Sequence, residues 1–110
     1  DPPYRQGTSV VEREATVGER YKMVNDENQK NAIENGNLRI GGWATSGDIP
    51  NQAFARDALA IRPEYKPDLS YVAEIEVVKP GAIVNDGVVG PQGILRGGAQ
   101  QIEQLMAPPQ

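Results

Sequence analysis

From Ser70 to Val78, apolar and acidic side chains alternate along the chain. The acidic side carries Glu74 and Glu76. The apolar side carries Tyr71, Ala73, Ile75 and Val77. Alternation with a period of two is typical of a strand with one buried face and one solvated face. The segment is therefore predicted to be a half-buried β-strand, with the two glutamates facing water.

Glycine and proline limit how long the other elements can be. The chain has 12 glycines and 9 prolines among 110 residues, with 38% hydrophobic and 24% charged residues. This composition is typical of a soluble, turn-rich globular domain and not of a disordered chain or a helical bundle. The length suits one domain, so residues 1–110 are predicted to form a single unit.

Further elements are expected on both sides of the alternating segment. Strands are predicted at 4–11, 38–44, 82–85, 88–89 and 100–105. One or two short helices are predicted over residues 12–35, roughly at 12–25 and 26–35. A further helix is predicted at 50–60, from apolar residues at helical spacing. Short helices among strands, with a strand-rich second half, indicate an α+β fold.

Composition and charge exclude several kinds of function. The chain contains no histidine and no cysteine, so it lacks the usual nucleophile–base pairs and zinc ligand sets, and no metal site is expected. No acidic cluster suits magnesium, which disfavours a nuclease. The net charge is −4, whereas a general nucleic-acid binder is usually basic, so this class of protein is disfavoured. No apolar run reaches membrane-spanning length, so no membrane partner is expected.

Gln101 and Glu103 form the most informative pair in the sequence. They lie two residues apart, directly after a glycine-hinged loop. Side chains two apart in an extended segment point to the same face, so both can project into one cleft. The alternative interpretation is the exposed polar face of an edge strand.

Two more segments carry candidate site residues. Tyr4 and Arg5 are the fourth and fifth residues, and an arginine side chain can bind a phosphate or a ribose through its planar guanidinium. In mid-chain, Trp43 stands between a glycine pair and the hydroxyl residues Thr45 and Ser46. An indole offers a stacking wall and hydroxyls can orient a ribose. The alternatives are a solvated arginine on an edge strand and a core tryptophan before a turn.

The order of these segments resembles the ADP-ribosyltransferase toxins of the arginine–serine–glutamate type. That family has an aromatic–arginine pair on its first core strand, a serine- or threonine-rich strand end, and a C-terminal Glu/Gln-x-Glu. Tyr4-Arg5, residues 43–46 and residues 101–103 match these motifs. Ala44 stands where the family usually has a first serine, so Thr45 and Ser46 both stay candidates for the key hydroxyl.

The resemblance implies a compact, mostly antiparallel β core split into two sheets, with short helices. It also implies NAD as a substrate: the bond between nicotinamide and ribose breaks, and ADP-ribose passes to a macromolecular acceptor. Glu103 is expected to be the carboxylate near the developing ribose cation. Gln101 is expected to face the acceptor, and an amide there favours an acceptor other than arginine, such as another protein side chain or a nucleic acid.

The remaining roles follow from the same resemblance. Arg5 is expected to hold the NAD pyrophosphate or the adjoining ribose. Thr45 or Ser46 is expected to orient the glutamate or the nicotinamide ribose. Trp43 or Tyr4 is expected to stack against a ring.

A toxin of this kind implies a cognate immunity protein, export or delivery as part of a longer polypeptide, and action in the cytosol of a target cell. The start at Asp1-Pro2-Pro3, with no initiator methionine, is similar to toxin domains at the ends of secreted polymorphic proteins. Two other functions stay open. One is an NAD glycohydrolase on the same scaffold, and the other is a non-enzymatic β-rich binding module.

Overall fold

The computed structural model describes residues 2–34 and 43–108, and six strands and two helices follow one another within them. In chain order they are β1 (Val11–Glu14), β2 (Arg20–Asn25), α1 (Glu27–Glu34), β3 (Trp43–Ala44), α2 (Gln52–Ala58), β4 (Tyr71–Glu76), β5 (Ile83–Val88) and β6 (Gln100–Met106). The predicted α+β fold with two mostly antiparallel sheets is confirmed.

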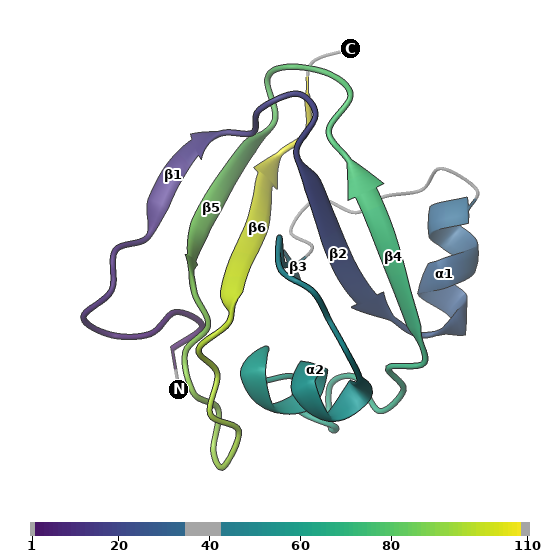
Figure 1. Cartoon of the computed structure of the whole chain (residues 1–110), viewed down its shortest axis with the longest axis vertical. Helices are drawn as coiled ribbons and strands as arrows, with labels where there is room; N and C mark the ends of the chain where they lie inside the picture. Colours follow the sequence, from purple (N-terminus) through teal and green to yellow (C-terminus); the bar gives the residue numbers. More distant parts are fainter. Residues whose placement is uncertain (1, 35–42, 109–110) are drawn as a thin grey trace.

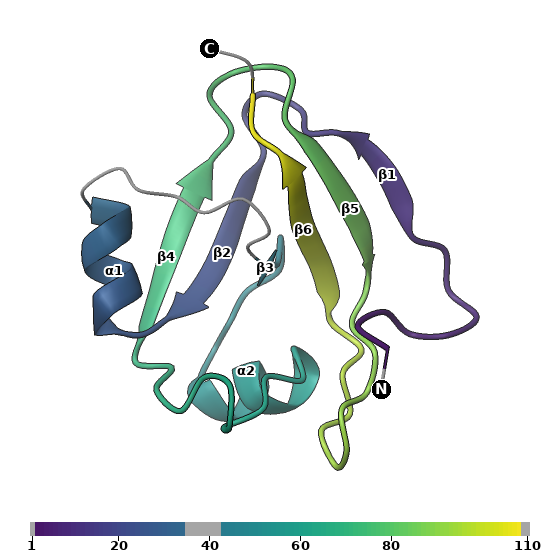
Figure 2. The same cartoon turned by 180° about the vertical axis from the view of Figure 1, so that it is seen from behind.

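The strands form two sheets that meet at β3 (Figures 1 and 2). One sheet has the order β1-β5-β6-β3, and the other pairs β2 with β4. Just past β3, Thr45 exchanges two backbone hydrogen bonds with Lys22 of β2, at 2.7 and 2.9 Å. The short strand β3 therefore pairs with β6 on one side and touches β2 on the other.

Strand β6 lies between β5 and β3, and its side chains alternate between two faces. Glu103 pairs with Asn85 of β5 and with Trp43 of β3. Its neighbour Ile102 pairs with Ala44 and belongs to the opposite face. Residues 101 and 103 therefore share one face of the sheet, and residues 100, 102 and 104 share the other.

Two hydrophobic clusters support the sheets. The first lies between the face of β6 that carries Ile102 and strand β2, and its buried members are Ala15, Tyr21, Ala82, Val84 and Ile102. The second joins β2 to α2 through Val24, Ala55 and Leu69. Helix α2 begins at a capping residue, because Asn51 Oδ1 accepts a 2.8 Å hydrogen bond from the Phe54 amide.

The predicted helix at 12–25 is wrong, because this segment forms β1, a turn and β2. Gly18 has a φ of +95°, a left-handed conformation that ends any helix. Beyond it, Arg20 pairs with Glu76 across two antiparallel strands. Pairing with a distant strand overrides the local helix preference of a charged segment.

The other predicted elements agree with the structure to different extents. Helices α1 and α2 and strands β4 and β6 confirm the predictions at 26–35, 50–60, 70–78 and 100–105. The predicted segments 82–85 and 88–89 form a single strand, β5. The predicted strand at 4–11 is largely wrong, since Tyr4 makes an isolated bridge and β1 starts at Val11. Of the strand predicted at 38–44, only Trp43–Ala44 lies within the described residues. No helix in the described part of the chain is long and apolar enough to span a membrane.

Candidate functional site

Four side chains from distant parts of the chain meet beside β6, and we call them the Tyr4–Glu103 cluster: Tyr4, Trp43, Asn85 and Glu103. The Tyr4 hydroxyl donates a 3.1 Å hydrogen bond to Oε1 of Glu103. The Asn85 amide donates to the same oxygen at 3.5 Å. The cluster thus holds one partly buried carboxylate between a phenol and an amide.

The backbone on both sides of Tyr4 fixes its ring above β5. Tyr4 bridges to Val89, and the Arg5 amide donates to the Val88 carbonyl at 2.8 Å. The ring then lies over Gly87, where an added Cβ would come within 2.6 Å of Tyr4 Cδ1. Glycine at position 87 therefore leaves the space that the tyrosine ring occupies.

Tyr4 is neutral at physiological pH, as an ordinary tyrosine is, and its surroundings favour the neutral form further. Desolvation raises the pKa of Tyr4 well above the usual tyrosine value, and the negative charges of Glu103 and Asp86 raise it further. A neutral phenol remains a hydrogen-bond donor at physiological pH. The Tyr4–Glu103 contact is therefore a charge-assisted hydrogen bond with the charge on Glu103.

Trp43 provides an exposed aromatic surface next to the carboxylate. Its ring centroid lies 5.8 Å from that of Tyr4, with a tilt of 56° between the two planes. Trp43 is 42% exposed, although it pairs with the half-buried Glu103 of β6. The indole is thus placed for contact with a molecule bound from outside, and not as a core residue.

Thr45 and Ser46 turn toward Gln100, on the other face of β6. Oε1 of Gln100 accepts hydrogen bonds from the Ser46 amide at 2.8 Å, the Ser46 hydroxyl at 3.0 Å and the Thr45 hydroxyl at 3.4 Å. Nε2 of Gln100 donates to Oδ1 of Asp86 at 2.8 Å. The structure therefore separates the predicted hydroxyl residues from Glu103 and joins them to Gln100 and Asp86.

Asp86 is in turn held by an arginine. Arg13 Nη2 lies 3.2 Å from Asp86 Oδ2, and Arg13 makes two hydrogen bonds to the Glu19 carboxylate at 2.8 and 2.9 Å. Hydrogen bonding from Arg13 lowers the pKa of Glu19 to about 2, against the opposing effect of burial. We call these six residues the Gln100 network: Arg13, Glu19, Thr45, Ser46, Asp86 and Gln100.

Arg5 and Gln101 lie apart from the carboxylate of Glu103. Arg5 is exposed, and its Nη2 donates to the backbone oxygen of Arg96 at 3.1 Å. The Gln101 side chain is only 7% exposed and donates to the Pro3 carbonyl at 3.2 Å. Of the seven predicted site residues, the structure brings Tyr4, Trp43 and Glu103 together.

The sequence analysis missed Asn85, Asp86 and Gln100. Asp86 precedes a glycine, a pair typical of a turn, although in the structure it lies inside β5. Gln100 adjoins the predicted Gln101–Glu103 motif but points to the opposite face. The pairing of β5 with β6 could have identified these residues. If Asn85 pairs with Glu103, then Asp86 lies on the same face of the sheet as Gln100.

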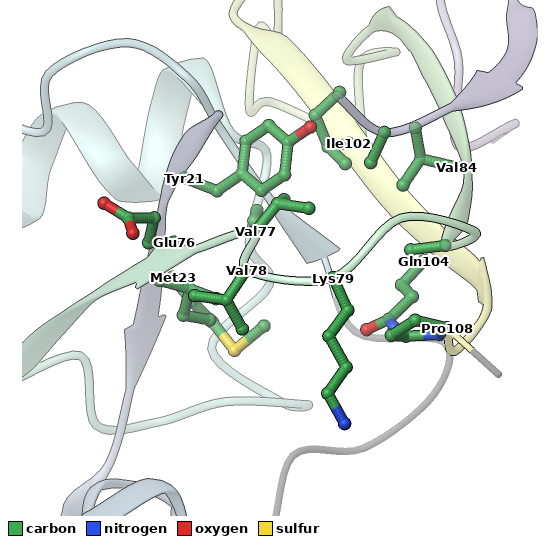
Figure 3. Close-up of a pocket in the computed structure, with 14 residues that line it drawn as sticks. Tyr21, Met23, Glu76, Val77, Val78, Lys79, Val84, Ile102, Gln104 and Pro108 are labelled. Atoms are coloured by element: carbon green, nitrogen blue, oxygen red, sulfur yellow. The ribbon is translucent and has the colours of Figure 1, made fainter. Parts of the chain in front are cut away.

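A separate apolar pocket of about 210 Å³ opens between the sheets. Figure 3 shows Tyr21, Val84 and Ile102 on one side of it and Met23 and Val78 on another. Strand β6 contributes Ile102 and Gln104, which belong to the face opposite to that of Glu103. The pocket therefore extends the first hydrophobic cluster and lies apart from the Tyr4–Glu103 cluster. Residues 2–34 and 43–108 contain no group of acidic side chains that could hold a metal ion.

Comparison with known proteins finds a relative among the solved structures. The chain matches no protein-family model and no curated protein. It is similar to a solved structure, that of Tne2 in complex with Tni2, with 36% sequence identity and a TM-score of 0.85. The similarity covers 94% of this chain and 87% of that chain.

Proposed function

Because this chain belongs to the family of Tne2, we propose that it is a toxin domain that consumes NAD by breaking the bond between nicotinamide and ribose. The relative was solved as a complex with Tni2, which supports a toxin and immunity-protein setting. In that setting the producing cell protects itself with a cognate binding protein. The domain is delivered as part of a longer polypeptide and acts in the cytosol of a target cell.

One observation carries the enzymatic part of the proposal, which is the hydrogen bond from Tyr4 to Glu103 beside the exposed ring of Trp43. Loss of neutral nicotinamide from NAD leaves positive charge on the ribose, as in glycoside hydrolysis. A fixed carboxylate beside that ribose stabilises the growing charge. Glu103 supplies the carboxylate, Tyr4 orients it, and Trp43 supplies a surface on which a planar ring can stack.

The placement of Gln101 favours water as the acceptor of ADP-ribose. Its side chain is 7% exposed and is engaged with the Pro3 carbonyl, so it is not presented to a macromolecule. Without an acceptor-binding amide, the simplest outcome is hydrolysis. We therefore propose NAD glycohydrolase activity as the principal reaction.

Transfer of ADP-ribose to a macromolecule is the second candidate. The loop from residue 90 to residue 98 favours it, because Ile94 at its tip is 95% exposed and Arg96 in the same loop contacts Arg5. Arg5 directly follows Tyr4, so this loop borders the segment that carries the tyrosine. An exposed apolar tip there suits contact with a protein or nucleic-acid acceptor other than an arginine side chain.

The test measures, by chromatography, whether the purified domain releases nicotinamide from NAD. Glu103→Gln keeps the shape of the side chain and removes its charge, and one lost transition-state contact of this kind costs about 10²- to 10³-fold in rate. Glu12→Gln is the matched control, since Glu12 pairs with Asn85 on the same sheet face but lies on exposed β1. Addition of a cell lysate with labelled NAD distinguishes transfer from hydrolysis.

We expect the parent domain and Glu12→Gln to release nicotinamide and Glu103→Gln to fail, with unchanged circular dichroism for all three. A folded parent domain that releases none would overturn the enzymatic proposal. Full activity of Glu103→Gln would remove the assigned role of that carboxylate.

A further inference from the structure

Strand β3 is too short to fix its own position. It pairs with β6 through only Trp43 and Ala44. Thr45 exchanges two backbone hydrogen bonds with Lys22 of β2. On the β6 side, Oε1 of Gln100 accepts three hydrogen bonds from Thr45 and Ser46. A two-residue ladder is weak by itself, so these side-chain contacts anchor the end of β3 to the start of β6.

The side-chain nitrogen of Gln100 is also hydrogen-bonded. Its Nε2 donates to Asp86 at 2.8 Å, and Asp86 is paired with Arg13 at 3.2 Å. Arg13 in turn binds the Glu19 carboxylate through two hydrogen bonds. A continuous series of hydrogen bonds thus runs from the turn between β1 and β2, across β5 and β6, to the end of β3.

Gln100 does not share a face with Glu103. Alternation along β6 sends the Gln100 side chain to the face that carries Ile102, while Glu103 faces Tyr4 and Trp43. Gln100 therefore reaches Trp43 through the backbone of β3, where Trp43 lies two residues before Thr45. It also contacts Asp86, the neighbour of Asn85 on β5.

We infer that Gln100 is a positioning residue, which sets Trp43 opposite Glu103 by anchoring Thr45 and Ser46 to Asp86. This inference rests on the proposed function in one respect, because the molecule that Trp43 contacts is taken to be NAD. The position of the indole itself does not depend on that assignment. Trp43 is the only tryptophan in the chain, so its fluorescence reports its surroundings directly.

The experiment compares Gln100→Leu with Gln104→Leu. Gln104 lies on the same strand and the same face, at the margin of the apolar pocket, and its replacement leaves the contacts to β3 in place. For each folded variant we measure the emission of Trp43, its quenching by acrylamide, and the KM and kcat of nicotinamide release. Asp86→Asn and the double variant with Gln100→Leu complete a mutant cycle.

For Gln100→Leu we expect a shifted emission maximum, stronger quenching, and a KM raised by about 2- to 10-fold, the range of one lost aromatic contact. The kcat should change less than the KM, because the carboxylate stays in place. Asp86→Asn should change the same quantities in the same direction, and the double variant should be no worse than the stronger single one. Gln104→Leu should match the parent domain.

Unchanged Trp43 emission and unchanged KM in folded Gln100→Leu would overturn the inference. A loss confined to kcat would also overturn it, because it would assign Gln100 to the chemistry and not to positioning. If Gln100→Leu does not fold, the emission and acrylamide quenching of Trp43 in Asp86→Asn decide, because the charge of Asp86 also acts directly on Tyr4 and so affects the kinetics. If the parent domain releases no nicotinamide, the proposed function fails, whereas the fluorescence comparison still decides whether Gln100 positions Trp43.

Discussion

The hydroxyl of Tyr4 and the carboxylate of Glu103 lie 3.1 Å apart, although 99 positions separate them in the chain. The N-terminal segment therefore completes a group of side chains that is otherwise built by β3, β5 and β6. Bridges from Tyr4 to Val89 and from Arg5 to Val88 hold this segment against the end of β5. The cluster forms only when both ends of the chain are in place.

Tyr4→Phe should lower kcat/KM for nicotinamide release by about 10- to 100-fold. The variant removes a hydrogen bond to an ionised carboxylate, which is worth about 1.5–3 kcal/mol, while the ring stays over Gly87. The measurement is steady-state kinetics with Tyr65→Phe as the control, because Tyr65 is 82% exposed. Equal kcat/KM values for the two variants would show that the Tyr4 hydroxyl does not orient Glu103.

Gly87→Ala should displace the Tyr4 ring and destabilise the domain by about 1–3 kcal/mol, as overpacking of a close contact does. The added Cβ would stand 2.6 Å from the ring, a distance that forces movement. Gly47→Ala is the control, since a Cβ there meets only the Thr45 hydroxyl, at an ordinary 3.8 Å. Urea unfolding measures both changes, and a Gly87→Ala domain as stable as Gly47→Ala would contradict the observed contact.

The ion pair between Arg13 and Glu19 should make stability depend on pH in the acid range. The Glu19 pKa is held at about 2, below its ordinary value of 4.5, mainly by hydrogen bonds from Arg13. A lowered folded-state pKa means that stabilisation is full above pH 4.5 and is lost as the pH falls toward 2. In Arg13→Gln the part of this contribution that Arg13 supplies is absent at every pH. The melting temperatures of Arg13→Gln and the parent domain should therefore converge as the pH falls, and a constant difference from pH 7 to pH 2 would contradict the expectation.

Gln101→Glu should destabilise the domain by about 1–3 kcal/mol, since a buried carboxylate would then face the Pro3 carbonyl. It should also lower nicotinamide release, because Pro3 precedes Tyr4. Gln104→Glu is the control, since Gln104 is more exposed on the same strand. A Gln101→Glu domain with unchanged stability and a changed acceptor would favour the original expectation for this residue, in which it faces the acceptor.

Strong local patterns allowed much of the fold to be predicted from the sequence. Alternating residues predicted β4, and apolar residues at helical spacing predicted α2. Both patterns indicate which side of the element is buried. The segment 12–25 lacks such a pattern, because the outward side chains of β2 are charged and one of them, Arg20, pairs with Glu74 and Glu76 of β4. That pairing spans more than 50 positions, so no local window reveals it.

Short motifs predicted Tyr4, Trp43 and Glu103, which the structure brings together. Glu103 was found because Gln101 and Glu103 stand in an extended segment after glycines. The contacts of Thr45 and Ser46 depend on Gln100 and Asp86, which are brought together by the β5–β6 register. Register between strands follows from the buried pattern of the whole sheet, and a short motif carries no information about it.

Alternation along β6 has a consequence for how such domains can diverge. Gln100 and Glu103 lie on opposite surfaces of one strand, because an odd number of positions, three, separates them. Gain or loss of a single residue between them would exchange those surfaces, turning the glutamate inward and an apolar side chain outward. Among homologous domains, the spacing from residue 100 to residue 103 is therefore expected to stay constant.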